Sequence, residues 1–186
     1  MAIPSQSFQG KLILDSGKLA GSYFDRSVIL ICRHDESGAF GLVLNRSLKH
    51  TLGSAVSEPL SADLAKTSLY LGGPVQPEAL SFLREREPSP EFDVLPGLVL
   101  GHSLKELKEA VAGETKPMRL RAYAGYSGWS SGQLDDEMKK GCWITQPAAM
   151  EFVFSLKPEM LWKEVLRRKG GAYHLVAECP DDPGLN

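Results

Sequence analysis

The sequence predicts one α+β domain built around a mixed β-sheet, and three observations favour this class. Short apolar strand patterns and amphipathic helical patterns follow one another irregularly, without the strict β-α-β period of a doubly wound sheet. The chain of 186 residues has the usual size of a single domain. No repeat, low-complexity tract or linker divides it. We therefore expect a single domain over 1–186, with its core in about 7–178 and a loose tail in 179–186.

The first two predicted strands are Lys11–Leu14 and Ser27–Cys32. The second is a continuous apolar, β-branched run, which is typical of a strand buried on both faces, so we expect it to be central. The polar residues 34–39 supply turn chemistry before a third strand, Phe40–Asn45. The second and third strands therefore predict an antiparallel hairpin with a longer loop.

A weak helical pattern covers 51–66 and contains Pro59, which predicts short helices instead of one long helix. Ser68–Leu71 is the next predicted strand, and Gly72-Gly73-Pro74 ends it. The segment Ala79–Leu83 is ambiguous between helix and strand, and residues 87–91 are predicted to form a loop.

In the second half, Leu98–Leu100 and Met118–Tyr126 are predicted strands. Ser103 and Glu106 form a capping box for a helix that Gly113 ends. Ser130 and Gln133 form a second box for a helix that Gly141 ends, and Pro158 is well placed as the first residue of a last helix. The basic residues 167–169 then lie at that helix's C-terminus, where they complement its dipole.

Composition and charge exclude several classes of protein. Hydrophobic residues make up 42% and charged residues 24% of the chain, as in soluble globular proteins. The formal net charge is −2, so no global positive field attracts a phosphate backbone. We expect neither a signal peptide nor a membrane span. The three cysteines, Cys32, Cys142 and Cys179, form no C-x-x-C pair, which favours the reducing cytoplasm.

Several segments closely resemble one bacterial family, the AlgH/YqgE-like family, in order and in spacing. They are Asp25–His34, Gly38–Arg46, Gly72–Val75, Gly125–Trp129, Gly132–Leu134 with Glu137, and Cys142-Trp143. The resemblance covers roughly Gly10 to Lys169. It implies a strongly bent mixed sheet, a half-barrel flanked by helices. It implies little about chemistry, because the family is largely of unknown function and one branch carries a transcriptional-regulator label that came from a phenotype.

The chain departs from the family's usual pattern in two loops. Asp15-Ser16-Gly17 stands where the family often has a proline, and the segment after Gly73 lacks a common histidine. These departures weaken any transfer of residue roles in those loops.

Two catalytic motifs are incomplete in this sequence. Gly125-Tyr126-Ser127-Gly128-Trp129 approaches the G-x-S-x-G nucleophile elbow, but Trp129 replaces the last glycine and Ser127 has no evident base, so a structural turn is favoured. His34-Asp35-Glu36 matches the H-x-E of zinc deaminases without the required P-C-x-x-C, so a hairpin loop is favoured. No phosphate-binding loop is present. We therefore predict no catalytic residue, no metal and no cofactor.

Cys32 and His34 raise the alternative of a redox-sensitive site. They would share a strand face if the strand continues that far, and Arg26 and Arg33 lie near enough in sequence to favour a thiolate. The competing interpretation is that Cys32 is a small buried hydrophobic residue, as most free cysteines are.

Arg119, Arg121 and Tyr123 alternate along one face of a predicted strand. Such a mixture can bind single-stranded nucleic acid, but a solvated or helix-covered face has the same pattern, and the negative net charge favours the latter. Nucleic acid therefore stays an unsupported partner.

The candidate ligand or partner site is a small cleft between two loops. Gly72-Gly73-Pro74 and residues 126–129, which include Ser127 and Trp129, are expected to be neighbours. Asn45, Arg46 and Gln133 are its expected polar groups, and Cys32 and His34 complete the candidate residues. Turn geometry alone would also explain the glycines and the proline.

The function expected from these observations is binding, in a regulatory role, by a non-enzymatic cytoplasmic protein. The transcriptional label enters by resemblance only, and the partner, a protein or a small molecule, is not identified. The alternative is a redox-responsive or small-molecule-processing enzyme that uses Cys32 and His34, or Ser127.

Overall fold

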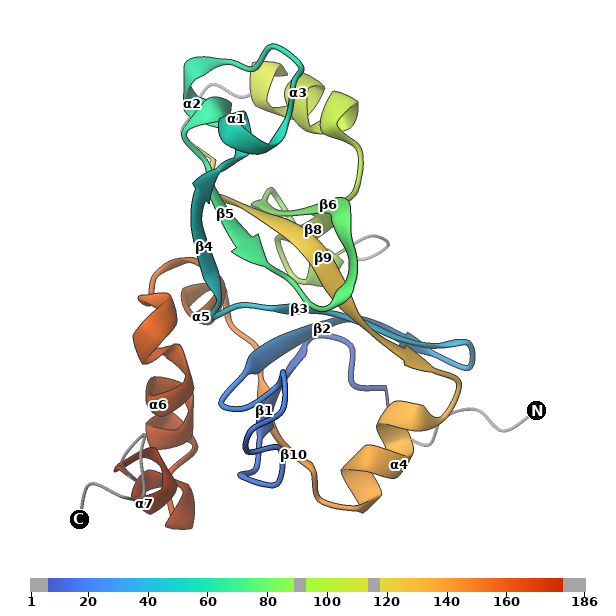
Figure 1. Cartoon of the computed structure of the whole chain (residues 1–186), viewed down its shortest axis with the longest axis vertical. Helices are drawn as coiled ribbons and strands as arrows, with labels where there is room; N and C mark the ends of the chain where they lie inside the picture. Colours follow the sequence, from blue (N-terminus) through green and yellow to red (C-terminus); the bar gives the residue numbers. More distant parts are fainter. Residues whose placement is uncertain (1–6, 89–92, 114–117, 179–186) are drawn as a thin grey trace.

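The computed structural model describes residues 7–88, 93–113 and 118–178, and these form ten strands and seven helices (Figure 1). The strands are β1 (Lys11–Asp15), β2 (Val28–Asp35), β3 (Gly38–Val43), β4 (Ser47–Thr51), β5 (Ser68–Leu71), β6 (Val75–Glu85), β7 (Asp93–Leu95), β8 (Leu98–Gly101), β9 (Leu120–Ser130) and β10 (Trp143–Pro147). The helices are α1 (Leu52–Ala55), α2 (Ala62–Ala65), α3 (Leu104–Gly113), α4 (Gln133–Lys139), α5 (Met150–Phe154), α6 (Pro158–Lys169) and α7 (Ala172–Glu178).

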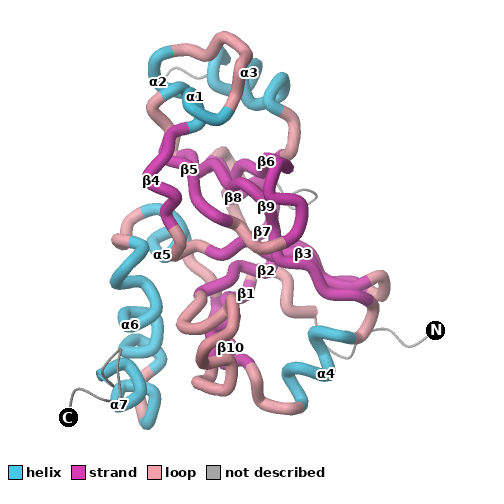
Figure 2. Tube along the Cα trace, in the orientation of Figure 1, coloured by secondary structure: helices cyan, strands magenta, loops and turns pink. Residues whose placement is uncertain are grey.

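The strands form one mixed and strongly bent sheet. Its main path runs β10-β1-β2-β3-β9-β6-β8-β7, and β4 and β5 join it through β9. The pairing of β5 with β9 is parallel, whereas β9 pairs antiparallel with β3 and β6. Figure 2 shows the strands curling between α4 at one end and α1, α2 and α3 at the other. The predicted class, a single α+β domain with a half-barrel sheet, is confirmed.

The central strand β2 is buried on both faces. Alternate residues of a strand point to opposite faces. Val28 and Leu30 accordingly pack into a central core, while Ile29 and Ile31 pack into a second cluster with Trp129, Leu134 and Trp143. The prediction that this run is central and buried on both faces is confirmed.

The central core joins the two halves of the sheet. It contains Leu12, Leu30 and Leu42 from β1–β3 together with Leu83 and Tyr123 from β6 and β9. Helices α5, α6 and α7 cover it, through residues such as Val153, Leu161 and Ala177. A third cluster packs the outer face of β6 and β9 against α1, α2 and α3.

The two halves meet where β9 changes partner. Residues 122–124 of β9 pair with β5, and residues 127–130 pair with β3. Gly125 stands between them with a φ of 67°, a left-handed conformation that glycine adopts without strain. At the same point the backbone of Gly72 lies against Gly125, and its N–H donates to the carbonyl of Ala124 at 2.9 Å.

Most of the predicted elements are present. The helix predicted from Ser103 and Glu106 is α3, and the Glu106 N–H donates to the Ser103 hydroxyl at 3.2 Å. Pro158 begins α6, and the pattern over 51–66 forms the short helices α1 and α2. The ambiguous segment Ala79–Leu83 belongs to strand β6.

One prediction about the strands requires correction, and two others cannot be compared. The β2–β3 connection is a tight two-residue turn, Glu36-Ser37, because both strands extend to the pair Asp35 and Gly38. The Asp35 carboxylate accepts the Ser37 N–H at 2.8 Å and closes this turn. The tail predicted for 179–186, and part of the loop predicted for 87–91, lie outside the described residues.

We expect Gly72→Ala to destabilise the fold by about 3 kcal/mol, because the added Cβ would overlap the backbone carbonyl oxygen of Gly125 and neither backbone can yield. Gly101→Ala is the matched control. A Cβ at Gly101 meets no atom within 4 Å, so stability should change by at most about 1 kcal/mol. Chemical denaturation measures both variants, and equal free energies of unfolding would show that the contact at Gly72 does not constrain the fold.

Candidate functional site

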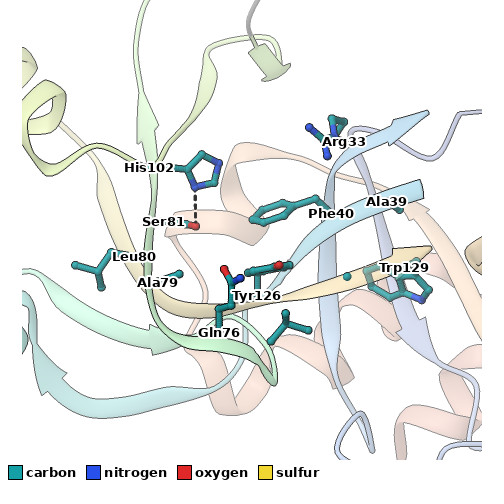
Figure 3. A pocket seen from close by; sticks show the side chains of 12 residues that line it. Arg33, Ala39, Phe40, Gln76, Ala79, Leu80, Ser81, His102, Tyr126 and Trp129 are labelled. Atoms are coloured by element: carbon teal, nitrogen blue, oxygen red, sulfur yellow. Dashed lines mark hydrogen bonds between the residues drawn. The ribbon is translucent and has the colours of Figure 1, made fainter. Parts of the chain in front are cut away.

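An open groove of about 800 Å³ lies beside the junction of the two sheet halves (Figure 3). Residues from β2, β3, β6 and β9, together with His102 just after β8, form its walls. The lining residues are Arg33, Ala39, Phe40, Val75, Gln76, Ala79, Leu80, Ser81, His102, Tyr126, Gly128 and Trp129.

A pair of stacked aromatic rings forms part of the groove wall. The centroids of Phe40 and Tyr126 are 4.8 Å apart, with 24° between the ring planes. The ring of His102 meets Phe40 edge-on at 5.5 Å. The register of β3 and β9 sets Phe40 opposite Gly128, and a Cβ at Gly128 would lie 3.2 Å from the Tyr126 ring. The absence of a side chain at Gly128 therefore leaves room for the stack.

Polar groups lie beside these rings. The Ser81 hydroxyl and Nδ1 of His102 are 3.0 Å apart, with Ser81 buried and His102 exposed. Gln76 has a φ of 45° and lies where the β6–β9 register shifts between Val75 and Leu80. Arg33 is exposed at the other end, with its Nε 3.5 Å from the Asp35 carboxylate. The groove thus offers ring faces, hydrogen-bonding groups and one cation.

The two loops expected to form a cleft are indeed neighbours, but they pack directly against each other. The buried Ser127 hydroxyl donates to the carbonyl of Gly72 at 3.1 Å. A Cβ on Gly73 would overlap the backbone of Tyr126. Gly72, Gly73 and Ser127 therefore join two backbones, and the groove opens beside them.

Asn45 and Arg46 stabilise the turn before β2. The Asn45 side chain accepts the Val28 N–H and donates to the Arg26 carbonyl, both at 2.9 Å. Nη2 of Arg46 donates to the carbonyl of Tyr23 at 2.7 Å, and the guanidinium lies over the Tyr23 ring at 5.3 Å. These polar groups are thus engaged away from the groove lining.

Trp129 and Gln133 are held by Glu137 on α4. Oε2 of Glu137 accepts the indole N–H groups of Trp129 at 2.9 Å and Trp143 at 2.7 Å. Oε1 accepts from the Gln133 amide at 3.0 Å. The Gln133 carbonyl in turn accepts the Ser130 N–H, but the predicted capping box is wrong, because α4 begins at Gln133 with Gly132 as its N-cap and Ser130 ends β9. This network holds the indole ring of Trp129 in place. Trp129 is also one of the residues that line the groove.

Cys32 and His34 do not share a face, although the strand continues past both residues. The β2–β3 register shifts between Ile31 and Arg33, so a bulge interrupts the alternation at Cys32. Cys32 packs in the central core, and burial raises the pKa of its thiol strongly. His34 lies on the opposite face. There it stacks on Phe8, which belongs to the second cluster, and lies close to Asp135 of α4.

Both ring nitrogens of His34 have partners. Nδ1 accepts the backbone N–H of Phe8 at 3.1 Å, which assigns the ring proton to Nε2. Nε2 is 3.3 Å from the Asp135 carboxylate. Within residues 7–88, 93–113 and 118–178, no three His, Cys, Asp or Glu side chains gather in a way that could hold a metal ion.

Four groove residues that offer rings or hydrogen-bonding groups were missed by the sequence patterns, namely Phe40, Gln76, Ser81 and His102. Phe40 was assigned only to a strand, Ser81 fell in the ambiguous segment, and His102 is an isolated histidine before the Ser103 cap. On the predicted polar strand face, Arg121 and Tyr123 are buried and Arg119 is exposed, so the face is covered except at Arg119. None of the helices in the described part of the chain has the length and apolar character that a bilayer crossing requires.

Comparison with known proteins identifies the family. An AlgH-like family model matches residues 12–174. UPF0301 proteins of Chlorobaculum parvum and Chlorobium luteolum are each 38% identical over 180 residues, which is 95% of this chain and 95% and 94% of theirs.

Solved structures agree with this assignment. The AlgH protein of Pseudomonas aeruginosa matches with a TM-score of 0.74 and 26% identity, over 98% of both chains. A protein of Corynebacterium diphtheriae shares the fold, with a TM-score of 0.72 and 23% identity over 94% of this chain and 93% of that one. The family match and the curated relatives together establish that the chain belongs to the AlgH-like family.

Proposed function

We propose that this protein acts by binding, in a regulatory role in the cytoplasm, and that the groove is its binding site. The observation that carries the proposal is the stacked pair Phe40 and Tyr126, which is partly buried against the central core and lines an open groove. Concave sites with aromatic walls and a few convergent polar groups are the usual form of ligand sites.

The expected ligand is a planar ring with hydrogen-bonding edges. The rings of Phe40 and Tyr126 can stack on it, an interaction worth ~1–3 kcal/mol per base where bases stack on aromatic side chains. Ser81, His102 and Gln76 offer donors and acceptors for its edges. The net charge of −2 and the burial of Arg121 and Tyr123 favour regulation without contact to duplex DNA.

The enzymatic alternative loses support at each residue on which it depends. Burial keeps Cys32 as a neutral thiol, which is a poor nucleophile. Both ring nitrogens of His34 are engaged, and Ser127 donates to a backbone carbonyl instead of to a base.

The Ser81–His102 pair does not restore that alternative. Within the described residues, the His102 ring hydrogen-bonds to Ser81, and no carboxylate orients the ring. A nucleophile and base normally need such an orienting group. We therefore assign the pair to ligand recognition.

Adenosine, a planar ring with polar edges, is the probe for the groove. We expect saturable NMR shifts at the amides of Ala39, Leu80 and Gly128, and about tenfold weaker binding in Phe40→Leu, which loses a ring face but keeps an apolar side chain. Met160→Ala, on the exposed face of α6, is the control that should bind normally. Shifts centred elsewhere, or unchanged affinity in Phe40→Leu, would contradict the assignment.

Alkylation distinguishes binding from thiol chemistry. At about pH 8, we expect iodoacetamide to modify Cys142 in the native protein but to leave Cys32 intact, because Cys32 is buried and its pKa is raised whereas Cys142 is partly exposed. Denaturant should make both cysteines reactive. Peptide mass analysis measures each site, and native labelling of Cys32 as fast as Cys142 would revive the redox alternative.

A further inference from the structure

Arg121 on β9 is a buried cation that makes no ion pair with any carboxylate in the described residues. Its exposed fraction is 7%. Nη1 donates to the carbonyl of Leu44, and Nη2 donates to the carbonyl of Leu156, both at 3.3 Å. The guanidinium lies 4.6 Å from the ring centre of Tyr70. A guanidinium has five N–H donors, and these two hydrogen bonds engage only part of them.

The neighbouring side chains do not supply a negative charge. Tyr123 is fully buried, and its hydroxyl lies beside the Arg121 guanidinium. Burial raises the pKa of the Tyr123 phenol, although the nearby Arg121 charge acts to lower it, so this phenol stays neutral. Burying a charge without a counter-ion is costly, and carbonyl dipoles with one aromatic face offset only part of the cost.

Arg121 reaches the wall of a second pocket, which shares no lining residue with the groove. This pocket measures about 250 Å³ and is lined by Ser68, Tyr70, Arg119, Leu120, Arg121 and Phe154. Tyr70, Leu120 and Phe154 give the wall an apolar part, while the two arginines give it positive charge. Its volume lies below the usual range for drug-sized ligands, which points to a small molecule.

Arg119 is a second cation in the same pocket, and Glu85 holds it at the surface. Nε of Arg119 donates to the Glu85 carboxylate at 2.8 Å, and its Nη2 donates to the other carboxylate oxygen. The guanidinium also lies over the Phe154 ring at 5.3 Å. Glu85 neutralises Arg119, so the charge of Arg121 is left without a carboxylate partner.

We propose that this pocket binds the carboxylate of a small organic acid. Arg121 is the buried anchor, because its planar donors match a carboxylate in two-point geometry. Arg119 provides the second cation at the mouth, and Tyr70 with Phe154 contact the apolar part of the acid. The alternative is that Arg121 has only a structural role. Its two hydrogen bonds would then simply connect Leu44, just after β3, with Leu156, between α5 and α6.

Benzoate is the probe, with benzyl alcohol as its neutral counterpart and phenyl phosphate as the competing oxyanion. We expect saturable shifts of the Arg121 and Arg119 side-chain N–H signals with benzoate, and at least tenfold weaker binding of benzyl alcohol. Tighter binding of phenyl phosphate than of benzoate would overturn the carboxylate assignment. If benzoate caused no shift of the Arg121 side-chain N–H signals, the proposal would be overturned and Arg121 would have only its structural role.

Charge variants at the mouth test the proposal without disturbing the interior. We expect Glu85→Gln to tighten benzoate binding by about threefold, because it removes a nearby negative charge and releases Arg119. We expect Arg119→Met to weaken it by about tenfold. Both residues are partly exposed, so both variants should fold. Glu58→Gln and Lys108→Met, from a surface ion pair elsewhere, are matched controls that should bind benzoate normally.

Arg121→Lys tests the anchor itself. It keeps the positive charge but loses the planar donors, and we expect at least tenfold weaker benzoate binding in a protein with a wild-type circular dichroism spectrum. Should this variant fail to fold, the opposite shifts of Glu85→Gln and Arg119→Met decide the question. Unchanged affinity in both mouth variants would overturn the proposal.

Discussion

The fold depends on a close backbone contact between Gly72 and Gly125. At this point β9 leaves β5 and begins to pair with β3, so a single strand belongs to both halves of the sheet. Side chains at these positions would separate the backbones, and Gly125 also adopts a left-handed conformation. Because the contact bends the sheet, leucines of β1, β2 and β3 can share one core with Leu83 and Tyr123.

Both candidate sites depend on that bend. The groove lies where Phe40 of β3 stacks on Tyr126 just beyond Gly125, and residues from the irregular start of β6 also line it. The pocket of Arg121 lies on the preceding part of β9, where the strand pairs with β5 and receives the Leu156 carbonyl from the chain after α5. One strand therefore contributes to two chemically different recesses, one aromatic and open, the other cationic and small.

The sequence predicts local structure here better than it predicts sites. The apolar run in β2, the cap at Ser103 and the proline at the start of α6 are decided by neighbours in the chain, and each is found where expected. Cys32 and His34 point to different faces because of a bulge, and nothing in the alternation of β2 announces a bulge. The role of Phe40 depends on its register opposite Gly128, and Arg121 is bonded to the carbonyl of Leu156, which lies 35 residues later in the chain.

The central claim is that one shared core unites both halves of the sheet through β9. Native-state hydrogen exchange tests it, because amides that exchange only through global unfolding report one common opening free energy. We predict equal values for the slowest amides of β2 in one half, and of β6 and β9 in the other. Opening free energies that differ by more than about 2 kcal/mol between the halves would show two independently unfolding units and contradict the account.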